Sequence, residues 1–287
     1  MKKVSKLFAF LLAGVMTLSL ASCGSDDSSS SAASKASQAA GSSASAASDS
    51  ENPEVARIQK AGVLKVSTEA GFEPFEYVDG DKVVGIDMDI AQYMADKWGV
   101  ELEVKDMNFD TALAEVATGN SDMALAGVSK TEERDQNMDF SDPYFSSNQV
   151  IVVKADNNDI TGKADLEDKT IGVQSGTTGD ILAVETVGDT DKIKRYDKYA
   201  VALQDMKNGQ IDCVIMDSYP AQKALAQNEG EIKILDEAMG ADEYCVAVSE
   251  GNADLQKAVN EVLKEMKDSG KLEEIFNNYK SSLEGDE

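Results

Sequence analysis

Hydrophobic positions follow the same pattern in two separate parts of the chain. Residues 113–126 and 203–216 both contain leucine, five residues, glycine, two residues and aspartate, followed by an apolar run. A glycine at this place ends a helix, and a continuous apolar run is typical of a buried parallel strand. Upstream of each copy, residues 63–71 and 170–179 are apolar runs that enter glycine-containing loops. The pattern therefore predicts two α/β units.

Further helices are indicated by apolar residues at helical spacing. One stripe ends at Gly99 and another precedes Gly270, and both predict a helix face that packs on a core. Asp87 and Asp110 are predicted to cap the N-termini of the helices that follow them. The stripe residues are Ile90, Met94 and Trp98 in the first case and Leu255, Val259, Val262 and Met266 in the second.

The two units predict a two-lobed α/β protein, with a parallel-rich sheet and flanking helices in each lobe. Two extended segments, 149–154 and 240–244, are predicted to cross between the lobes, and two crossings make a hinge. We therefore assign residues 53–148 plus 245–287 to lobe 1 and residues 149–244 to lobe 2.

The ends of the predicted strands indicate where a ligand would bind. Open parallel sheets place their ligand sites at the carboxyl ends of strands. In this chain those ends are the loops 69–75, 127–134 and 175–180, together with Asp217.

The N-terminus has the layout of a bacterial export signal. Residues 1–22 combine a basic start with an apolar stretch that is too short for a comfortable membrane helix. The small residues before Cys23 resemble a lipobox, which would make Cys23 the lipidated first residue; ordinary cleavage beside an incidental cysteine is the alternative. Residues 23–52, mostly serine and alanine, predict a disordered tether. We expect an extracytoplasmic protein that only this lipid anchors to the cell membrane.

Composition narrows the classes of function. The chain has 27 Lys and Arg against 53 Asp and Glu, and such an acidic surface argues against nucleic acid and against anionic lipid as partners. It has no histidine, which removes Ser-His-Asp chemistry and imidazole zinc sites. No calcium-loop motif is present, and we expect neither a metal nor a cofactor. Cys213 and Cys245 lie in apolar runs and are predicted to be core thiols; a disulfide between them is the alternative.

Arg134 follows an apolar strand and a turn that contains Gly127 and Ser129. A guanidinium offers a planar fork of donors to a carboxylate, and turn amides can add further hydrogen bonds. The alternative is an arginine that pairs with Glu132, Glu133 or Asp135 on a solvated turn.

Several motifs together resemble a known family. They are V-S-T-E-A-G-F-E-P-F-E-Y, V-V-G-I-D-M-D-I-A, M-N-F-D-T-A-L, A-G-V-S-K-T-E-E-R, F-S-D-P-Y, G-V-Q-S-G-T-T-G, G-Q-I-D-C-V-I-M-D and D-S-G-K-L-E-E-I-F. In this order they cover nearly all of residues 60–280. The chain resembles the extracytoplasmic polar amino-acid-binding proteins of ABC importers, whose fold is the two-lobed periplasmic-binding-protein type II fold. The resemblance implies a free amino acid as ligand and a membrane permease as partner, and we expect a monomer.

The resemblance also implies how the two ends of an amino acid are held. Arg134 matches the arginine that binds the α-carboxylate, with help from Gly127, Ser129 and the amide of Thr178 at a helix N-terminus. Asp217 matches the aspartate that binds the α-ammonium from the other lobe.

The same resemblance implies a side-chain pocket. Phe72 and Phe109 match its aromatic walls, and Glu69 matches an acidic residue that contacts the ligand side chain; core packing and a plain loop acid are the respective alternatives. Gln174 and Met216 stand where glutamine-binding members have a lysine and a histidine. The loss of two cations favours arginine or lysine over glutamine, histidine or cystine.

Two other classes of function stay open. A cyclohexadienyl-dehydratase-like enzyme on this scaffold would use Glu69 or Glu73 as a general acid. A surface sensor without a transport role would need only the binding site.

Overall fold

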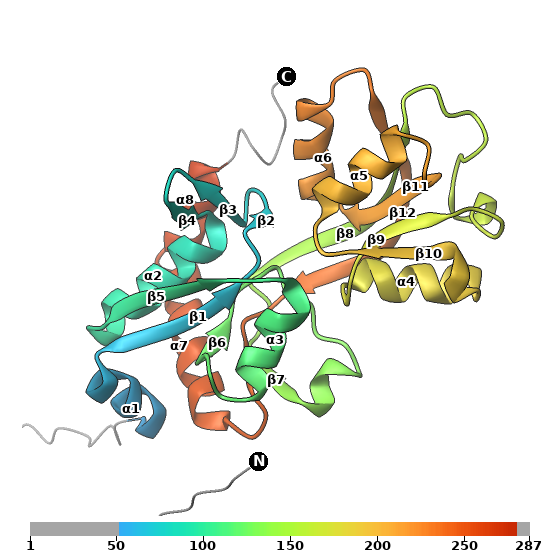
Figure 1. Ribbon diagram of the computed structural model, residues 1–287. Helices are drawn as coiled ribbons and strands as arrows, with labels where there is room; N and C mark the ends of the chain where they lie inside the picture. The colour runs from blue at the N-terminus through green and yellow to red at the C-terminus, as the bar shows by residue number, and fades with distance from the viewer. Residues whose placement is uncertain (1–51, 280–287) are drawn as a thin grey trace, which may run out of the picture. The chain divides into compact units, whose positions relative to one another are not determined.

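The computed structural model describes residues 52–279 (Figure 1). Its helices are α1 (Pro53–Ala61), α2 (Ile86–Trp98), α3 (Phe109–Ala117), α4 (Thr178–Val187), α5 (Tyr199–Lys207), α6 (Ser218–Gln227), α7 (Ala253–Asp268) and α8 (Lys271–Asn278), with short 3-10 turns η1 (Arg134–Gln136), η2 (Lys163–Asp165) and η3 (Thr190–Lys192). Its strands are β1 (Val63–Thr68), β2 (Gly71–Phe72), β3 (Glu76–Asp79), β4 (Lys82–Val84), β5 (Glu101–Asp106), β6 (Met123–Ala124), β7 (Met138–Phe140), β8 (Phe145–Lys154), β9 (Ile171–Gln174), β10 (Ile193–Tyr196), β11 (Cys213–Asp217), β12 (Ile232–Tyr244) and β13 (Ala247–Ser249).

Two five-stranded sheets confirm the predicted two-lobed α/β fold. Lobe 1 has the strand order β5-β1-β6-β13-β7, in which β1 runs parallel to β5 and β6 and β13 runs antiparallel to its neighbours. Lobe 2 has the order β10-β9-β11-β8-β12, in which β9 runs parallel to β10 and β11. Helices α4, α5 and α6 pack on the second sheet, and α1, α2, α3 and α7 pack on the first. A small sheet, β2-β3-β4, completes lobe 1.

The repeated aspartate has the same structural role in both lobes. Asp122 Oδ2 accepts a hydrogen bond from the Lys65 backbone N–H at 2.8 Å, and the Asp122 N–H donates to the Lys65 carbonyl at 2.9 Å. Asp212 makes the matching pair of bonds with Thr170, at 2.7 and 2.8 Å. Each aspartate therefore ties the turn after a helix to the start of the lobe's first parallel strand.

Strands β8 and β12 connect the lobes. They pair antiparallel from Ile232 opposite Lys154 to Tyr244 opposite Phe145, and the chain then enters β13 of lobe 1. Both predicted crossing segments lie within these strands. The ribbon in Figure 1 shows β8 and β12 running side by side between the two sheets. The sequence boundaries that we assigned to the lobes remain a prediction.

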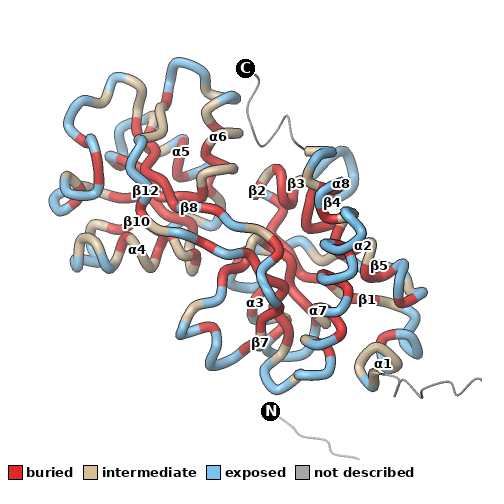
Figure 2. The backbone as a smooth tube through the Cα atoms, turned by 180° about the vertical axis from the view of Figure 1, so that it is seen from behind, coloured by how far each residue is buried: buried red, intermediate tan, exposed pale blue. Residues whose placement is uncertain are grey.

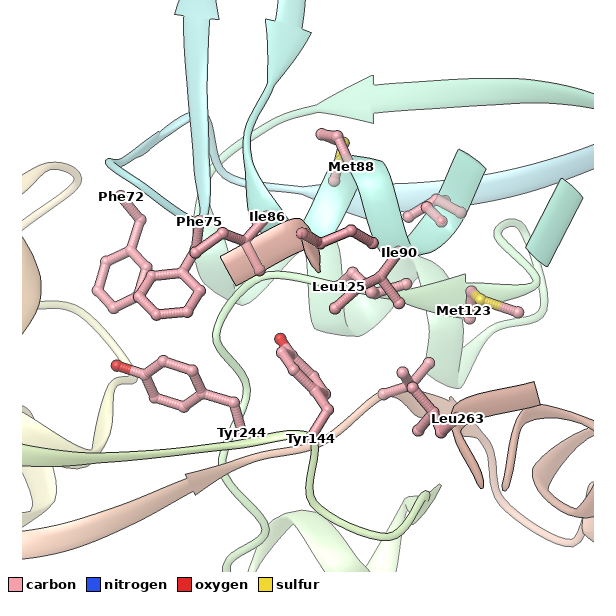
Figure 3. Close-up of a cluster of buried hydrophobic side chains, with 14 of the residues drawn as sticks. Phe72, Phe75, Ile86, Met88, Ile90, Met123, Leu125, Tyr144, Tyr244 and Leu263 are labelled. Carbon is pink, nitrogen blue, oxygen red and sulfur yellow. The ribbon is translucent and has the colours of Figure 1, made fainter. Parts of the chain in front are cut away.

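Aromatic side chains fill the junction between the lobes. The ring of Phe75 lies 5.0 Å from both the Phe145 ring and the Tyr244 ring, measured between centroids. Figure 3 shows Phe72 and Phe75 facing Tyr244, with Tyr144 beside it. The lobe 1 ends of both strands, at Phe145 and Tyr244, thus pack on one buried core. Along the rest of β8 and β12 buried residues are interrupted by exposed ones, as the change from red to pale blue along the tube shows (Figure 2).

The predicted core stripes are confirmed, and the predicted caps are wrong. All seven stripe residues are buried. Helix α2 begins after Gly85 and α3 after Asn108, so Asp87 and Asp110 lie inside the first turn of each helix. Asp87 is fully buried and bonds tertiary partners instead of its own helix end.

Cys213 and Cys245 are buried free thiols, as predicted. Within residues 52–279, no helix is long and apolar enough to cross a membrane. The predicted export signal, Cys23 and nearly all of the tether lie outside the described residues.

Candidate functional site

A cavity lies between the lobes and brings all nine predicted ligand-binding residues together. About 20 Å³ inside it is open to the centre of a water-sized sphere, so the lobes enclose little free space at the site. Its lining residues come from the ends of strands in both large sheets, from the small sheet β2-β3-β4 and from the starts of α3, α4 and α5. They are Glu69, Phe72, Glu76, Phe109, Ala126, Gly127, Ser129 and Arg134 from lobe 1, and Gln174, Thr177, Thr178, Tyr199 and Asp217 from lobe 2.

Arg134 is a buried cation at one end of this cavity. Its side chain lies over the Phe109 ring, 5.1 Å from the centroid, and the residue is only 7% exposed. Nη1 donates to the Ser129 carbonyl at 2.5 Å and Nη2 donates to the Gly176 carbonyl of lobe 2 at 2.8 Å. Burial lowers the pKa of Arg134, and the charge of Asp242 opposes that shift.

The structure therefore does not show Arg134 as a solvated residue paired with Glu132, Glu133 or Asp135, which was the alternative interpretation. Asp135, its neighbour on the turn, instead pairs with Lys130 at 2.6 Å on the outside of the protein. Arg134 turns inward and keeps the remaining donors of its guanidinium at the cavity. Such a group can bind an anion in a site from which water is excluded.

Helix α4 starts at the same end of the cavity. Thr177 is its N-cap and Thr178 its first residue, as predicted, so the positive end of the helix dipole lies beside the Arg134 side chain. Gly127, in contrast, donates its N–H to Asp87 Oδ2 at 3.0 Å. The Gly127 amide is thus bonded within the protein, and the donors close together at this end are Arg134 and the N-terminus of α4.

Asp217 lies at the end of β11, on the lobe 2 wall. It accepts hydrogen bonds from the Tyr244 hydroxyl and from Gln149 Nε2, the latter at 2.6 Å. The same Gln149 nitrogen donates to Asp242 Oδ2 at 2.7 Å, so two carboxylates share one amide. Burial, followed by the charge of Asp242, raises the pKa of Asp217 to about 7. A ligand ammonium would relieve this crowding of negative charge.

Glu69 lies at the cavity, but its carboxylate is already occupied. Oε2 accepts a hydrogen bond from Gln174 Nε2 at 3.0 Å, and Oε1 lies 3.1 Å from Lys198 Nζ as an ion pair without hydrogen-bond geometry. Both partners belong to lobe 2. Position 174, where the resemblance places the lysine of glutamine-binding members, therefore contributes a side-chain amide that donates to Glu69.

Glu76 is a site residue that sequence reasoning missed. It is fully buried at the start of β3 beside the carboxyl of Asp87, and within the described part of the chain no N–H or O–H donor reaches either of its oxygens. Burial raises its pKa well above the usual range, and the charges of Asp87 and Glu69 add to that shift. Its position between Phe75 and Tyr77, an acid inside an aromatic strand, was the available signal.

Asp87 supports the floor of the site next to Glu76. It accepts hydrogen bonds from the Tyr144 hydroxyl at 2.7 and 2.8 Å as well as from Gly127. Burial raises its pKa to about 6, although these hydrogen bonds favour the ionised form. A second buried acid so close to Glu76 makes this part of the cavity strongly attractive to a cation.

Met216 does not lie at the site. It is 1% exposed within the core and is absent from the cavity lining, so only position 174 carries the predicted loss of a cation. Tyr199, which was not predicted, lines the cavity near Phe72, with ring centroids 6.4 Å apart.

The site therefore presents one buried guanidinium at one end and several buried carboxyls around the remainder. In residues 52–279 no cluster of histidine, cysteine or acidic side chains is arranged to hold a metal ion. Opposite charges at opposite walls suit a zwitterion. The additional acid, Glu76, suits a second positive charge on the same molecule.

Comparison with known proteins agrees with this geometry. Residues 64–282 match the family model of bacterial extracellular solute-binding proteins, family 3. The chain belongs to that family.

Relatives of this family-3 protein bind amino acids. The arginine-binding extracellular protein ArtP of Bacillus subtilis is 31% identical over 74% of this chain and 84% of its own. The L-cystine-binding protein TcyA of the same species is 33% identical over 77% and 82%. In structure, the amino acid ABC transporter substrate-binding protein AbpA from Streptococcus pneumoniae, solved with L-arginine, has a TM-score of 0.73 at 33% identity and covers 80% of this chain and 99% of its own.

Proposed function

We propose that this family-3 solute-binding protein binds a free amino acid with a cationic side chain, arginine first, and delivers it to the permease of an ABC importer. One observation carries the choice of ligand. Glu76 is a fully buried carboxyl in the cavity whose neighbour is the Asp87 carboxyl, and no N–H or O–H donor from residues 52–279 reaches either of its oxygens. Burial raises the pKa of Glu76, and a ligand cation bound beside it would stabilise the ionised carboxylate.

In this proposal the three charges of arginine meet three parts of the wall. Arg134 and the N-terminus of α4 bind the α-carboxylate. Asp217 binds the α-ammonium, and the guanidinium faces Glu76, with Phe72 and Phe109 as apolar walls. A planar guanidinium can use both oxygens of Glu76, whereas an amide has two N–H donors and no charge.

Supporting observations come from both the charges and the relatives. The lining contains three acids, Glu69, Glu76 and Asp217, and one cation, Arg134. A ligand with an acidic side chain would bring a fourth carboxylate to this wall, so we expect glutamate to bind worst. The names of ArtP and of the arginine complex of AbpA point to the same ligand class.

Experiments can distinguish this proposal from other ligands and from other classes of function. Glutamine, histidine and cystine remain the alternative ligands, and cystine is supported by TcyA. For dehydratase chemistry, both acids considered from the sequence are paired with lysines: Glu69 with Lys198 and Glu73 with Lys223 at 2.9 Å. We therefore propose binding without turnover.

The same proposal includes anchoring by lipidated Cys23, the lobe boundaries and a monomeric state.

The direct test measures binding of arginine and citrulline by isothermal titration calorimetry. Citrulline has a neutral urea group in place of the guanidinium and is otherwise nearly the same shape. We expect wild type to bind arginine more tightly, and Glu76→Gln to weaken arginine by about 2–3 kcal/mol with little effect on citrulline. Glu73→Gln, three residues away and outside the cavity, is the matched control. Equal binding of the two ligands to wild type would contradict the cationic preference.

A further inference from the structure

Lys198 reaches the site from outside the cavity lining. It is the residue before α5 in lobe 2, and its side chain is 44% exposed. Its ammonium nevertheless lies 3.1 Å from Oε1 of Glu69, whose side chain is 3% exposed. An exposed cation of lobe 2 is thus placed on a buried anion of lobe 1.

The contact belongs to a small network around Glu69. Gln174 donates to the other Glu69 oxygen and also to the carbonyl of Asp197, the residue before Lys198. The loop before α5 and the end of β9 therefore meet Glu69 together. Because these groups lie in the lobe opposite Glu69, the contact depends on the two lobes being together.

A second interlobe ion pair lies nearby but outside the cavity. Lys223 of α6 pairs with Glu73 at 2.9 Å, and both residues line a separate groove on the outer side. The two pairs join the same two lobes with the same residue types. They differ in the place of the acid: Glu69 is 3% exposed and lines the ligand cavity, whereas Glu73 is 26% exposed and does not line it.

Building on the proposed function, we propose that Lys198 is a specificity-determining residue that sets the net charge at the side-chain end of the site. When the lobes meet, its ammonium neutralises Glu69. The pocket then offers the ligand the buried carboxyl of Glu76, which a bound cation would favour in its ionised form. Without Lys198, two carboxylates would face the ligand side chain, and discrimination in favour of cationic ligands would rise.

The test uses the ratio of the arginine and citrulline affinities of the full-length protein, measured by calorimetry. Lys198→Gln should raise the arginine-to-citrulline ratio about fivefold, the size expected for one partly screened ion pair. Glu69→Gln should lower the ratio by a similar factor, because it leaves Lys198 without its carboxylate. The double variant Glu69→Gln with Lys198→Gln should return close to the wild-type ratio, since it removes both charges.

Lys223→Gln is the matched control for the loss of an interlobe ion pair. It should weaken both ligands by the same factor and leave their ratio unchanged. The inference would be overturned if Lys198→Gln had the same arginine-to-citrulline affinity ratio as wild type. It would also be overturned if the ratio of the double variant remained different from that of wild type. Absence of any amino-acid binding by wild type would instead overturn the proposed function, and the inference with it.

Discussion

The two lobes share a scaffold and differ in the charges that they bring to the cavity. Asp122 in lobe 1 and Asp212 in lobe 2 make the same pair of backbone hydrogen bonds, to Lys65 and to Thr170. After the first parallel strand of each sheet, however, lobe 1 places Glu69 and lobe 2 ends in Gln174. A repeated fold therefore does not repeat the chemistry at its strand ends.

The difference makes the lobes complementary. Lobe 1 supplies the guanidinium of Arg134 and the buried carboxyl of Glu76, and lobe 2 supplies Asp217. A zwitterion needs partners for both of its charges, and these lie in different lobes. Ligand binding and the meeting of the lobes are thus expected to be coupled.

The largest effect should come from removing the cation of lobe 1. Arg134→Ala should cost about 2–5 kcal/mol of arginine binding, because the ligand carboxylate is left desolvated without its partner. Lys130→Ala, on the same turn but in an exposed ion pair with Asp135, should change binding little. Calorimetry on both variants checks this, and undiminished binding by Arg134→Ala would refute the role of this residue.

Protonation of the lobe 2 acid should have the next largest effect. With the pKa of Asp217 near 7, binding of an ammonium should be about tenfold weaker at pH 6 than at pH 8, because binding needs the ionised carboxylate. Titration calorimetry across this range measures the change. A flat profile would mean that Asp217 does not bind the ammonium.

The ligand-free protein should respond to pH in the opposite direction. Folding raises the pKa values of Asp217 and Asp87 above the unfolded value of about 4, so the folded state holds more protons between pH 4 and 7. Stability should therefore fall as pH rises through this window and level off above it. Urea unfolding of wild type and Asp217→Asn checks this, and the variant should show a shallower slope.

The close approach of the lobes offers a steric test of intermediate size. Gly176 has φ of 71°, and a Cβ added there would lie 1.7 Å from Asp110 Oδ1 of lobe 1. Gly176→Ala should weaken binding by about 1–3 kcal/mol through strain and obstruction of closure. Gly188→Ala carries a similar φ of 67° with no atom within 4 Å, so it should cost stability without affecting affinity. Equal affinities of the two variants would exclude the obstruction.

The smallest effects should come from the shared scaffold. Asp212→Asn should lower unfolding free energy by about 1 kcal/mol through its weakened bond to Thr170. Asp122→Asn should cost slightly more, since Asp122 also pairs with Arg57 at 2.6 Å. Urea melts of both variants measure the difference, and neither change should alter ligand affinity. A marked loss of affinity in either would show that the scaffold and the site are less separate than the fold indicates.

Local patterns were sufficient to predict the elements and the place of the site. Glycine-ended helices and apolar strands depend on neighbouring residues, so they can be recognised in one sequence. Seven of the nine predicted ligand-binding residues lie in the strand-end loops, and Phe109 and Gln174 were predicted from the family resemblance alone. Their roles in binding remain predictions.

What the sequence could not supply was the set of tertiary partners. An acid in the first turn fits both a cap and a tertiary contact, which is why Asp87 and Asp110 were assigned wrongly. In a strand buried on both faces, alternation does not show which side chain faces a ligand, and Met216 packs in the core. Nothing local shows that Glu69 forms an ion pair across the cleft while Glu76 lies beside another acid, Asp87.

The interlobe bonds also bear on the populations of open and closed molecules. Ser175 donates to Asp110 at 2.8 Å, Arg134 donates to the Gly176 carbonyl, and two lysines pair across the cleft. These contacts are made by the protein alone, so they raise the fraction of ligand-free molecules already closed. The apparent affinity for the ligand increases with the population of the binding-competent state. A closed cavity, however, slows the entry of the ligand. Substitutions that weaken these interlobe contacts should therefore speed up ligand binding and shorten the lifetime of the complex.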